Sequence, residues 1–138
     1  MKRISTKGIV TIMLLAGCAG SVNRQPTTES VPDPLAAMEG RWRNAESGDC
    51  ATNWFEYSVA PNRRQYTTRR SNGPSNTATV LHTEPNRVYL FYDGETRRTP
   101  QGDLLLWWMI FEGPKQYRMR RIDWAQDSRT TFFWLKCD

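Results

Sequence analysis

The stretch "LLLWWMIFEGPKQYRMRRID", residues 104–123, contains two runs of strand-forming residues separated by a Gly-Pro pair. Aromatic and β-branched residues favour strands, and Gly-Pro is a strong turn signal. In the second run Tyr117 and Met119 alternate with arginines, which indicates a strand with one buried face and one solvated face. The stretch therefore predicts two antiparallel strands joined by a tight turn.

Turn signals also separate strand-forming runs on both sides of this stretch. Turn signals rich in Gly, Pro, Asn and Asp recur every nine to thirteen residues or so, and no convincing 3.6-residue apolar stripe lies between them. This pattern predicts an all-β domain over residues 38–138, either a small antiparallel up-and-down β-barrel of about eight strands or a β-sandwich. The expected strands are 40–44, 53–60, 63–71, 76–83, 86–92, 103–112, 115–123 and 129–137.

Residues 104–111 differ from the other strands because they are apolar on both faces. One face would fill the interior, and the other would leave large apolar side chains, including Trp107 or Trp108, on the outside. A bare apolar patch usually marks an interaction site, so these two tryptophans are the candidate binding surface. The alternatives are that the 95–102 loop or residues 19–37 cover the patch.

About eight strands in a hundred residues resemble the small lipocalin-like barrels, and Gly40-Arg41-Trp42 resembles their Gly-x-Trp motif at the head of the first strand. The resemblance implies that Gly40 lets the chain enter tightly and that Trp42 plugs one end of the barrel. The family also places an arginine near the last strand against that tryptophan, and Arg129 is the candidate here.

Residues 1–17 have the features of a secretory signal peptide. Three basic residues precede an apolar run that ends in small residues, and this run is about half the length of a transmembrane helix. Leu15-Ala16-Gly17-Cys18 resembles the lipobox of bacterial lipoprotein precursors. The resemblance implies cleavage between Gly17 and Cys18, a diacylglycerol thioether on Cys18 and an acyl chain such as palmitate on its new amine. Because Ala19 follows, the family pattern favours an outer-membrane anchor with the domain in the periplasm.

Residues 18–37 contain several prolines together with Ser and Thr, and they are expected to form a flexible lipidated tether. The whole chain has 19 Lys and Arg against 14 Asp and Glu, a net charge of +5. Removal of the signal peptide takes three bases and no acid, which leaves a net charge of +2. The basic character therefore gives no reason to expect nucleic-acid binding.

Two cysteines remain after Cys18. In an oxidising periplasm, an even number of remaining cysteines predicts a disulfide, here between Cys50 and Cys137. Free buried thiols are the alternative. Because the bridge would close a loop across most of the domain, the chain-entropy model gives it roughly 4 to 5 kcal/mol.

No catalytic pattern is present in the sequence, so we expect a protein that is not an enzyme and that has no cofactor. His82 is the single histidine, and nothing places it in a triad or in a metal-ligand cluster. The acids Asp93, Glu95 and Asp103 lie near turn signals and read as solvated turn residues.

These observations favour a non-catalytic binding module attached to the membrane by its lipid, with a protein or envelope component as partner. Arginines in adjacent pairs allow an anionic partner, although a solvated arginine-rich exterior is the favoured explanation because the acids nearly balance the bases. One alternative is a structural or assembly lipoprotein, such as a pilotin-like or envelope-machine subunit. Another is a lipocalin-like barrel for a small apolar ligand, although six Trp and five Phe favour a filled interior.

Overall fold

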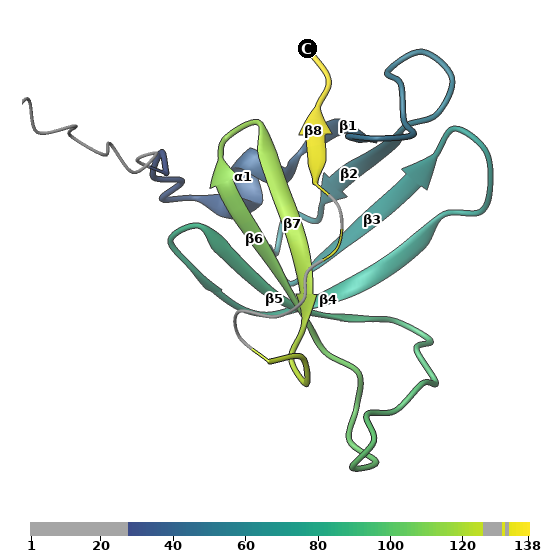
Figure 1. The fold of residues 1–138 in the computed structure, drawn as a ribbon, viewed down its shortest axis with the longest axis vertical. Coiled ribbons are helices and arrows are strands. Elements are labelled where there is room, and N and C mark those ends of the chain that lie inside the picture. The colour runs from purple at the N-terminus through teal and green to yellow at the C-terminus, as the bar shows by residue number, and fades with distance from the viewer. Residues whose placement is uncertain (1–27, 126–130, 132) are drawn as a thin grey trace, which may run out of the picture.

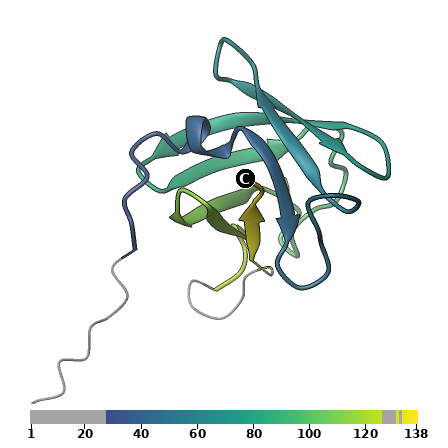
Figure 2. The ribbon, with the colours of Figure 1, turned by 90° about the horizontal axis from the view of Figure 1, so that it is seen from above.

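The computed structural model describes residues 28–125, 131 and 133–138, and its eight strands close into one antiparallel barrel (Figures 1 and 2). Each expected strand is present, so the predicted all-β class is confirmed and the barrel replaces the sandwich alternative. The elements are α1 (Pro34–Met38), β1 (Gly40–Asn44), β2 (Phe55–Val59), β3 (Gln65–Arg70), β4 (Asn76–Glu84), β5 (Arg87–Tyr92), β6 (Trp107–Gly113), β7 (Gln116–Arg121) and β8 (Trp134–Lys136).

Neighbouring strands in sequence are neighbours in the sheet, and β1 pairs with β8 to close the barrel. This up-and-down order agrees with the architecture that the lipocalin-like resemblance implies. The pairing of β8 with its other neighbour, β7, is short. In the described residues its register covers Leu135 and Trp134. The signal-peptide residues, Gly17, Cys18 and Arg129 lie outside the described residues.

Several expected strands are longer in the prediction than in the structure, and the clearest cases are those expected over 103–112 and 129–137. The strand expected from residue 103 begins at Trp107, because the preceding apolar residues belong to the β5–β6 connection. There the amide of Thr99 donates to the carbonyl of Asp103, and Arg98 forms an isolated bridge with Leu104. The strand expected over 129–137 has only Trp134–Lys136 in strand geometry among the described residues.

The core follows the side-chain alternation of the strands. Inward-facing residues of successive strands are fully or almost fully buried, among them Tyr57, Tyr66, Leu90, Met109 and Tyr117. Outward-facing neighbours carry the charges, as in β7, where Arg118 and Arg120 flank Met119. One face of each strand therefore fills the barrel and the other meets solvent, as the period of two requires.

One end of the barrel is closed by residues that we expected in the tether. Asp33 caps α1 by accepting a hydrogen bond from the amide of Ala36 at 3.2 Å. Val31 and Leu35 are 4% and 3% exposed and belong to the hydrophobic core. The expected tether boundary at residue 37 is therefore corrected, because burial of these side chains holds residues 31–37 against the barrel.

The Gly-x-Trp motif lies beside this closed end. Gly40 has φ +102°, a conformation that favours glycine, and Trp42 is fully buried with its indole N–H donating to the Met38 carbonyl at 2.7 Å. The cation beside Trp42 is Lys136, whose Nζ lies 5.4 Å from the ring centroid and donates to the carbonyl of Ala37. Lys136 of β8 is thus a cation that contacts Trp42, and the expectation for Arg129 falls outside the described residues.

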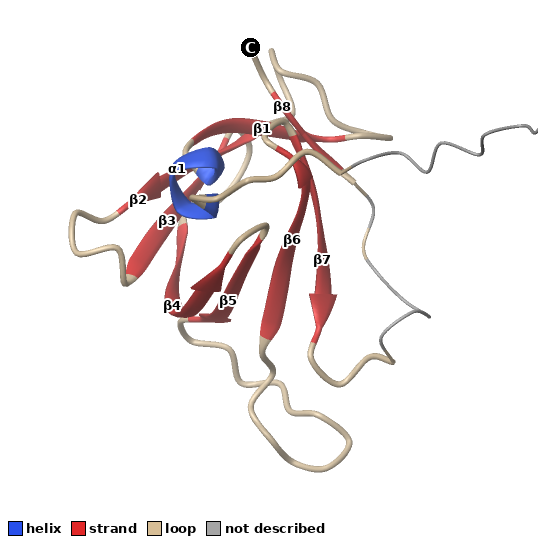
Figure 3. Ribbon diagram, turned by 90° about the vertical axis from the view of Figure 1, so that its left-hand side faces the viewer, coloured by secondary structure: helices blue, strands red, loops and turns tan. Residues whose placement is uncertain are grey.

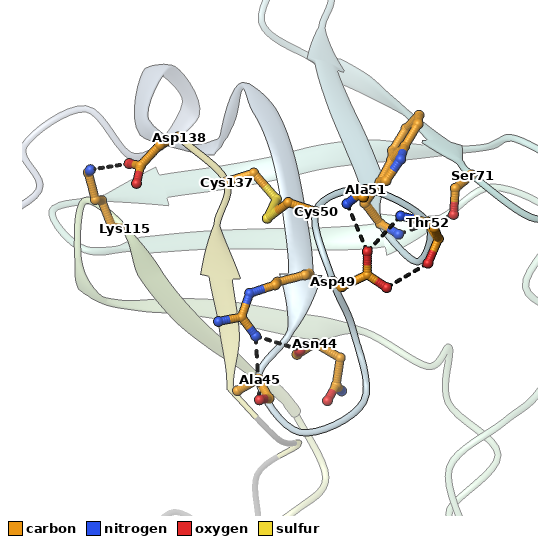
Figure 4. Close-up of a disulfide and its surroundings, with 12 residues drawn as sticks. Asn44, Ala45, Asp49, Cys50, Ala51, Thr52, Ser71, Lys115, Cys137 and Asp138 are labelled. Atoms are coloured by element: carbon orange, nitrogen blue, oxygen red, sulfur yellow. Dashed lines mark hydrogen bonds and ion pairs between the residues drawn. A yellow bond between two sulfur atoms is a disulfide. The ribbon is translucent and has the colours of Figure 1, made fainter.

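The predicted disulfide is present, with Cα atoms of Cys50 and Cys137 5.8 Å apart (Figure 4). It ties the β1–β2 connection to the residue that follows β8. Asp49 shapes that connection by accepting hydrogen bonds from the amides of Ala51 and Thr52. The bridge therefore lies next to the short β1–β8 seam.

Candidate functional site

The end of the barrel opposite α1 holds a cavity of about 730 Å³. The long β5–β6 connection projects from this end, whereas the β4–β5 and β6–β7 turns lie at the end closed by α1 (Figures 1 and 3). The volume falls within the usual range of small-molecule sites. We call this space, lined by residues of all eight strands and by the adjoining connections, the cavity.

Aromatic side chains line the inner part of the cavity, because the inward positions of five strands are aromatic here. The rings of Phe55 and Trp134 lie 4.8 Å apart in edge-to-face contact. The aromatic lining residues are Trp54, Phe55, Tyr57, Tyr92, Trp107, Tyr117 and Trp134, and most of the other lining residues are polar.

The inner end of the cavity is formed by two tyrosines. The hydroxyls of Tyr57 and Tyr117 are 2.7 Å apart and hydrogen-bonded, and burial raises the pKa of both phenols well above the usual value. Behind them Trp42 and Phe111 pack against Tyr117, with the Trp42 ring 4.8 Å from it. The barrel is therefore filled at the α1 end and hollow at the other.

Three buried polar atoms of the wall have no hydrogen-bond partner. They are the indole Nε1 atoms of Trp107 and Trp134 and the Oδ1 atom of Asn76. An unpaired buried donor or acceptor costs about 1 to 3 kcal/mol, so buried polar groups are almost always paired with protein or with a bound molecule. These atoms have almost no accessible surface, so they lie behind the cavity surface and do not face its open space.

Arg70 stands at the rim of the cavity. Tyr66 and Thr68 are the buried positions of β3, so the period of two turns Arg70 inward as well. No carboxylate within ion-pair distance of Arg70 is found in the part of the chain that the structure describes. Arg70 is exposed and lies opposite Phe55 in the β2–β3 register. Burial raises the pKa of Tyr57 and Tyr92, and the positive charge of Arg70 opposes both shifts.

The other charged groups around the cavity have partners. Glu95 accepts hydrogen bonds from the backbone amide and Nε of Arg97, and these bonds lower its pKa to about 2. Asp93 accepts from the hydroxyls of Thr77 and Thr79, which lie on the outward face of β4. Arg70 is therefore the charged cavity residue without a charge partner among the described residues.

The two predicted tryptophans lie on opposite faces of β6. Trp107 lines the cavity, with its ring 6.3 Å from that of Tyr92. Trp108 points outward, where its ring lies 4.6 Å from Tyr89 and Arg87 lies 5.9 Å above it. Leu104 is 43% exposed. Of the expected outer patch, Trp108 therefore belongs to the outside and Trp107 to the interior.

Sequence reasoning missed Arg70, Asn76 and Trp134 as site residues. The signal was present in "QYTTRR", residues 65–70, where extending the alternation from Tyr66 turns Arg70 toward the interior. His82 is exposed on β4, beside the bulge between Val80 and His82.

Within the described ranges, no cluster of three or more His, Cys, Asp or Glu residues is placed to hold a metal ion. Over the same residues, the structure has no helix with the length and apolar character needed to cross a bilayer.

The fold and the cavity define a small antiparallel barrel that is closed by a helix at one end and open to solvent at the other. Comparison of the chain with protein-family models, with curated protein sequences and with solved structures finds no match. The cavity is therefore the feature of the molecule from which we infer its function.

Proposed function

We propose that this protein is a lipid-anchored protein of the bacterial envelope whose barrel binds a small molecule at its open end, without catalysis. The cavity opposite α1 is the observation that carries the proposal. It combines aromatic side chains at its inner end with polar side chains, including Arg70, around its mouth. Ligand sites are concave spaces in which apolar and aromatic surface is combined with polar groups that fix the orientation of the ligand, and this cavity offers both.

The cavity favours the lipocalin-like alternative over the other functions that the sequence allowed. A filled barrel was expected from the abundance of Trp and Phe. Trp42 and Phe111 do fill the α1 end, but Trp107 and Trp134 stand in the wall at the open end and leave space between the strands. A purely structural barrel gains nothing from a hollow end.

The anchor and the compartment in this proposal come from the sequence. The lipobox resemblance ending at Cys18 and the Ala19 that follows it favour lipidation and retention at the outer membrane. The Cys50–Cys137 disulfide is typical of a protein that folds in an oxidising compartment such as the periplasm.

Adjacent tryptophans on opposite faces of β6 allow a matched test. We would titrate the full unlipidated chain, oxidised to form its disulfide, with the neutral fluorescent probe N-phenyl-1-naphthylamine. The wild type and Trp108→Leu should bind the probe saturably and alike, whereas Trp107→Leu should bind it at least several-fold more weakly. Absence of saturable binding, or equal loss in both variants, would refute the proposal.

A protein partner on the outer face of β5 and β6 is the second candidate function. Trp108 and Tyr89 are half-buried and in ring contact, and with Arg87 over the Trp108 ring they form an aromatic and cationic surface of the kind enriched at interfaces. Co-purification from gently solubilised envelopes tests it with the same variants. A partner that is lost in Trp108→Leu and retained in Trp107→Leu would support this function, and recovery unchanged in both would exclude it.

A further inference from the structure

We infer that the cavity is selective for small aromatic molecules that carry one anionic group, with Arg70 binding the anion and the aromatic wall holding the flat body. This inference rests on the proposed function, because it names the class of ligand that the same site would take. Three features of the cavity support it: its charge, its donors and its depth.

The charge of the cavity favours an anion. Arg70 turns inward at the rim and has no carboxylate partner among the described residues, whereas its strand neighbour Arg69 faces outward and pairs with Glu56 at 2.5 Å. The acids near the cavity cannot neutralise Arg70, because Glu95 is held by Arg97 and Asp93 by two threonine hydroxyls. A guanidinium fork binds a carboxylate, sulfonate or phosphate through two parallel hydrogen bonds.

The donors of the cavity favour a ligand rich in acceptors. An indole N–H can only donate, and the guanidinium of Arg70 has five N–H donors and no acceptor. Arg70 is exposed at the rim, so its donors can reach acceptors on a ligand, whereas the indole Nε1 atoms of Trp107 and Trp134 lie behind the cavity surface. Asn76 Oδ1 is the single unpartnered buried acceptor of the wall. A cationic amine would leave the donors of Arg70 unpaired beside a positive charge.

The depth of the cavity favours a short, flat molecule over a long acyl chain. Tyr57 and Tyr117 close the inner end through their hydroxyl hydrogen bond, and the buried Trp42 lies directly behind them. A chain of many methylenes would have to displace this packed layer. The indoles and phenols of the wall instead offer faces and edges on which an aromatic body can stack.

Two probes that share one aromatic skeleton separate this inference from the proposed function. 1-Anilinonaphthalene-8-sulfonate carries a sulfonate, and N-phenyl-1-naphthylamine lacks it. Both would be titrated by fluorescence into the full unlipidated, oxidised chain, because micelles and vesicles take up either probe. We expect the sulfonate to bind about tenfold more tightly than the neutral probe. This gain in affinity lies between the gain from an exposed ion pair and the gain from a buried hydrogen bond to a charged group.

Arg70→Gln should remove this preference and leave binding of the neutral probe unchanged. Arg69→Gln is the matched control, since it removes an arginine from the outward face of the same strand, and it should preserve the preference. Arg70 makes no ion pair with a described residue, so we expect Arg70→Gln to fold normally, and its melting curve checks this. If it does not fold, the salt dependence of the wild-type preference serves instead, because a preference due to Arg70 must weaken as salt increases.

The outcomes are distinct. If neither probe binds saturably, the proposed function fails and the inference fails with it. If both bind equally in the wild type, or if Arg70→Gln keeps the preference, the inference is overturned while the binding barrel stands. If Trp107→Leu leaves sulfonate binding intact, the probe occupies another surface and the inference is overturned as well.

Discussion

Removal of the Cys50–Cys137 bridge should destabilise the protein strongly. The two cysteines are 87 residues apart in sequence, and the chain-entropy relation for a loop of that length gives about 4.6 kcal/mol at 25 °C. For a domain of this size, 1 kcal/mol shifts the melting temperature by about 4 °C, so the largest expected decrease is about 18 °C. We expect the double variant Cys50→Ser/Cys137→Ser to approach this value.

The position of the bridge predicts a second effect of the same variant. The bridge secures the end of β8, a strand of three residues whose register with β7 covers two residue pairs in the described part of the chain. Trp134 lies on that strand and lines the cavity. Loss of the bridge should therefore weaken binding of N-phenyl-1-naphthylamine at temperatures well below the melting transition.

The assay compares thermal unfolding of the oxidised wild type, the reduced wild type and the double variant, followed by circular dichroism. The reduced protein and the variant should agree, because both remove only the cross-link. A decrease in melting temperature of less than about 3 °C in both would refute the reasoning, because the closed loop would then contribute little of the entropy assigned to it.

Three further predictions concern the anchor, the closed end and the rim. Cys18→Ser should leave the precursor unprocessed and without acyl label. Globomycin, which blocks the lipoprotein signal peptidase, should make the wild-type precursor accumulate. Normal processing of the variant would contradict the assignment of the lipobox. Leu35→Ala should lower the free energy of unfolding, measured in urea, by about 2 to 5 kcal/mol, because Leu35 is 3% exposed. A loss below about 1 kcal/mol would mean that α1 does not pack as part of the domain. Hydrogen bonds from Arg97 lower the pKa of Glu95 from 4.5 to about 2, so the pair stabilises the fold above pH 4.5 and that stability is lost as the pH falls toward 2. Glu95→Gln should therefore reduce the change of melting temperature with pH between these two values. If the melting temperature of the variant falls with acid as steeply as that of the wild type, the pair does not contribute as we expect.

The strands could be predicted because their signals are local. Positive-φ residues such as Asn86 and Gly94 end strands wherever they occur, and the alternation around Tyr117 and Met119 sets which face is buried. The run Leu104–Leu106 has the same strand-forming composition, yet it belongs to the β5–β6 connection. Composition cannot distinguish a strand from an apolar connection, because pairing with a neighbouring strand decides the outcome.

The helix and the cavity depend on contacts that composition does not reveal. A helix of five residues is too short to show an apolar period, and α1 forms where Leu35 and Met38 can cover the barrel end. Its local signals, Asp33 as cap and Pro34 in the first turn, were present in a segment whose other prolines suggested a tether. Whether an aromatic residue fills a barrel or stands in its wall depends on its layer along the barrel axis, which the residue count does not specify.

The two ends of the barrel have separate tasks in this proposal. Residues 28–33 reach the barrel at the end closed by α1, where the side-chain oxygen of Asn86 accepts from the amide of Val31 at 3.1 Å. The chain from Cys18 to Val31 spans at most about 45 Å when fully extended. In this proposal a tether from Cys18 joins the barrel at the end opposite the cavity, so the cavity mouth can face away from the point of attachment. A ligand would enter from the aqueous side, which agrees better with a small anionic aromatic molecule than with a lipid taken from the anchoring bilayer.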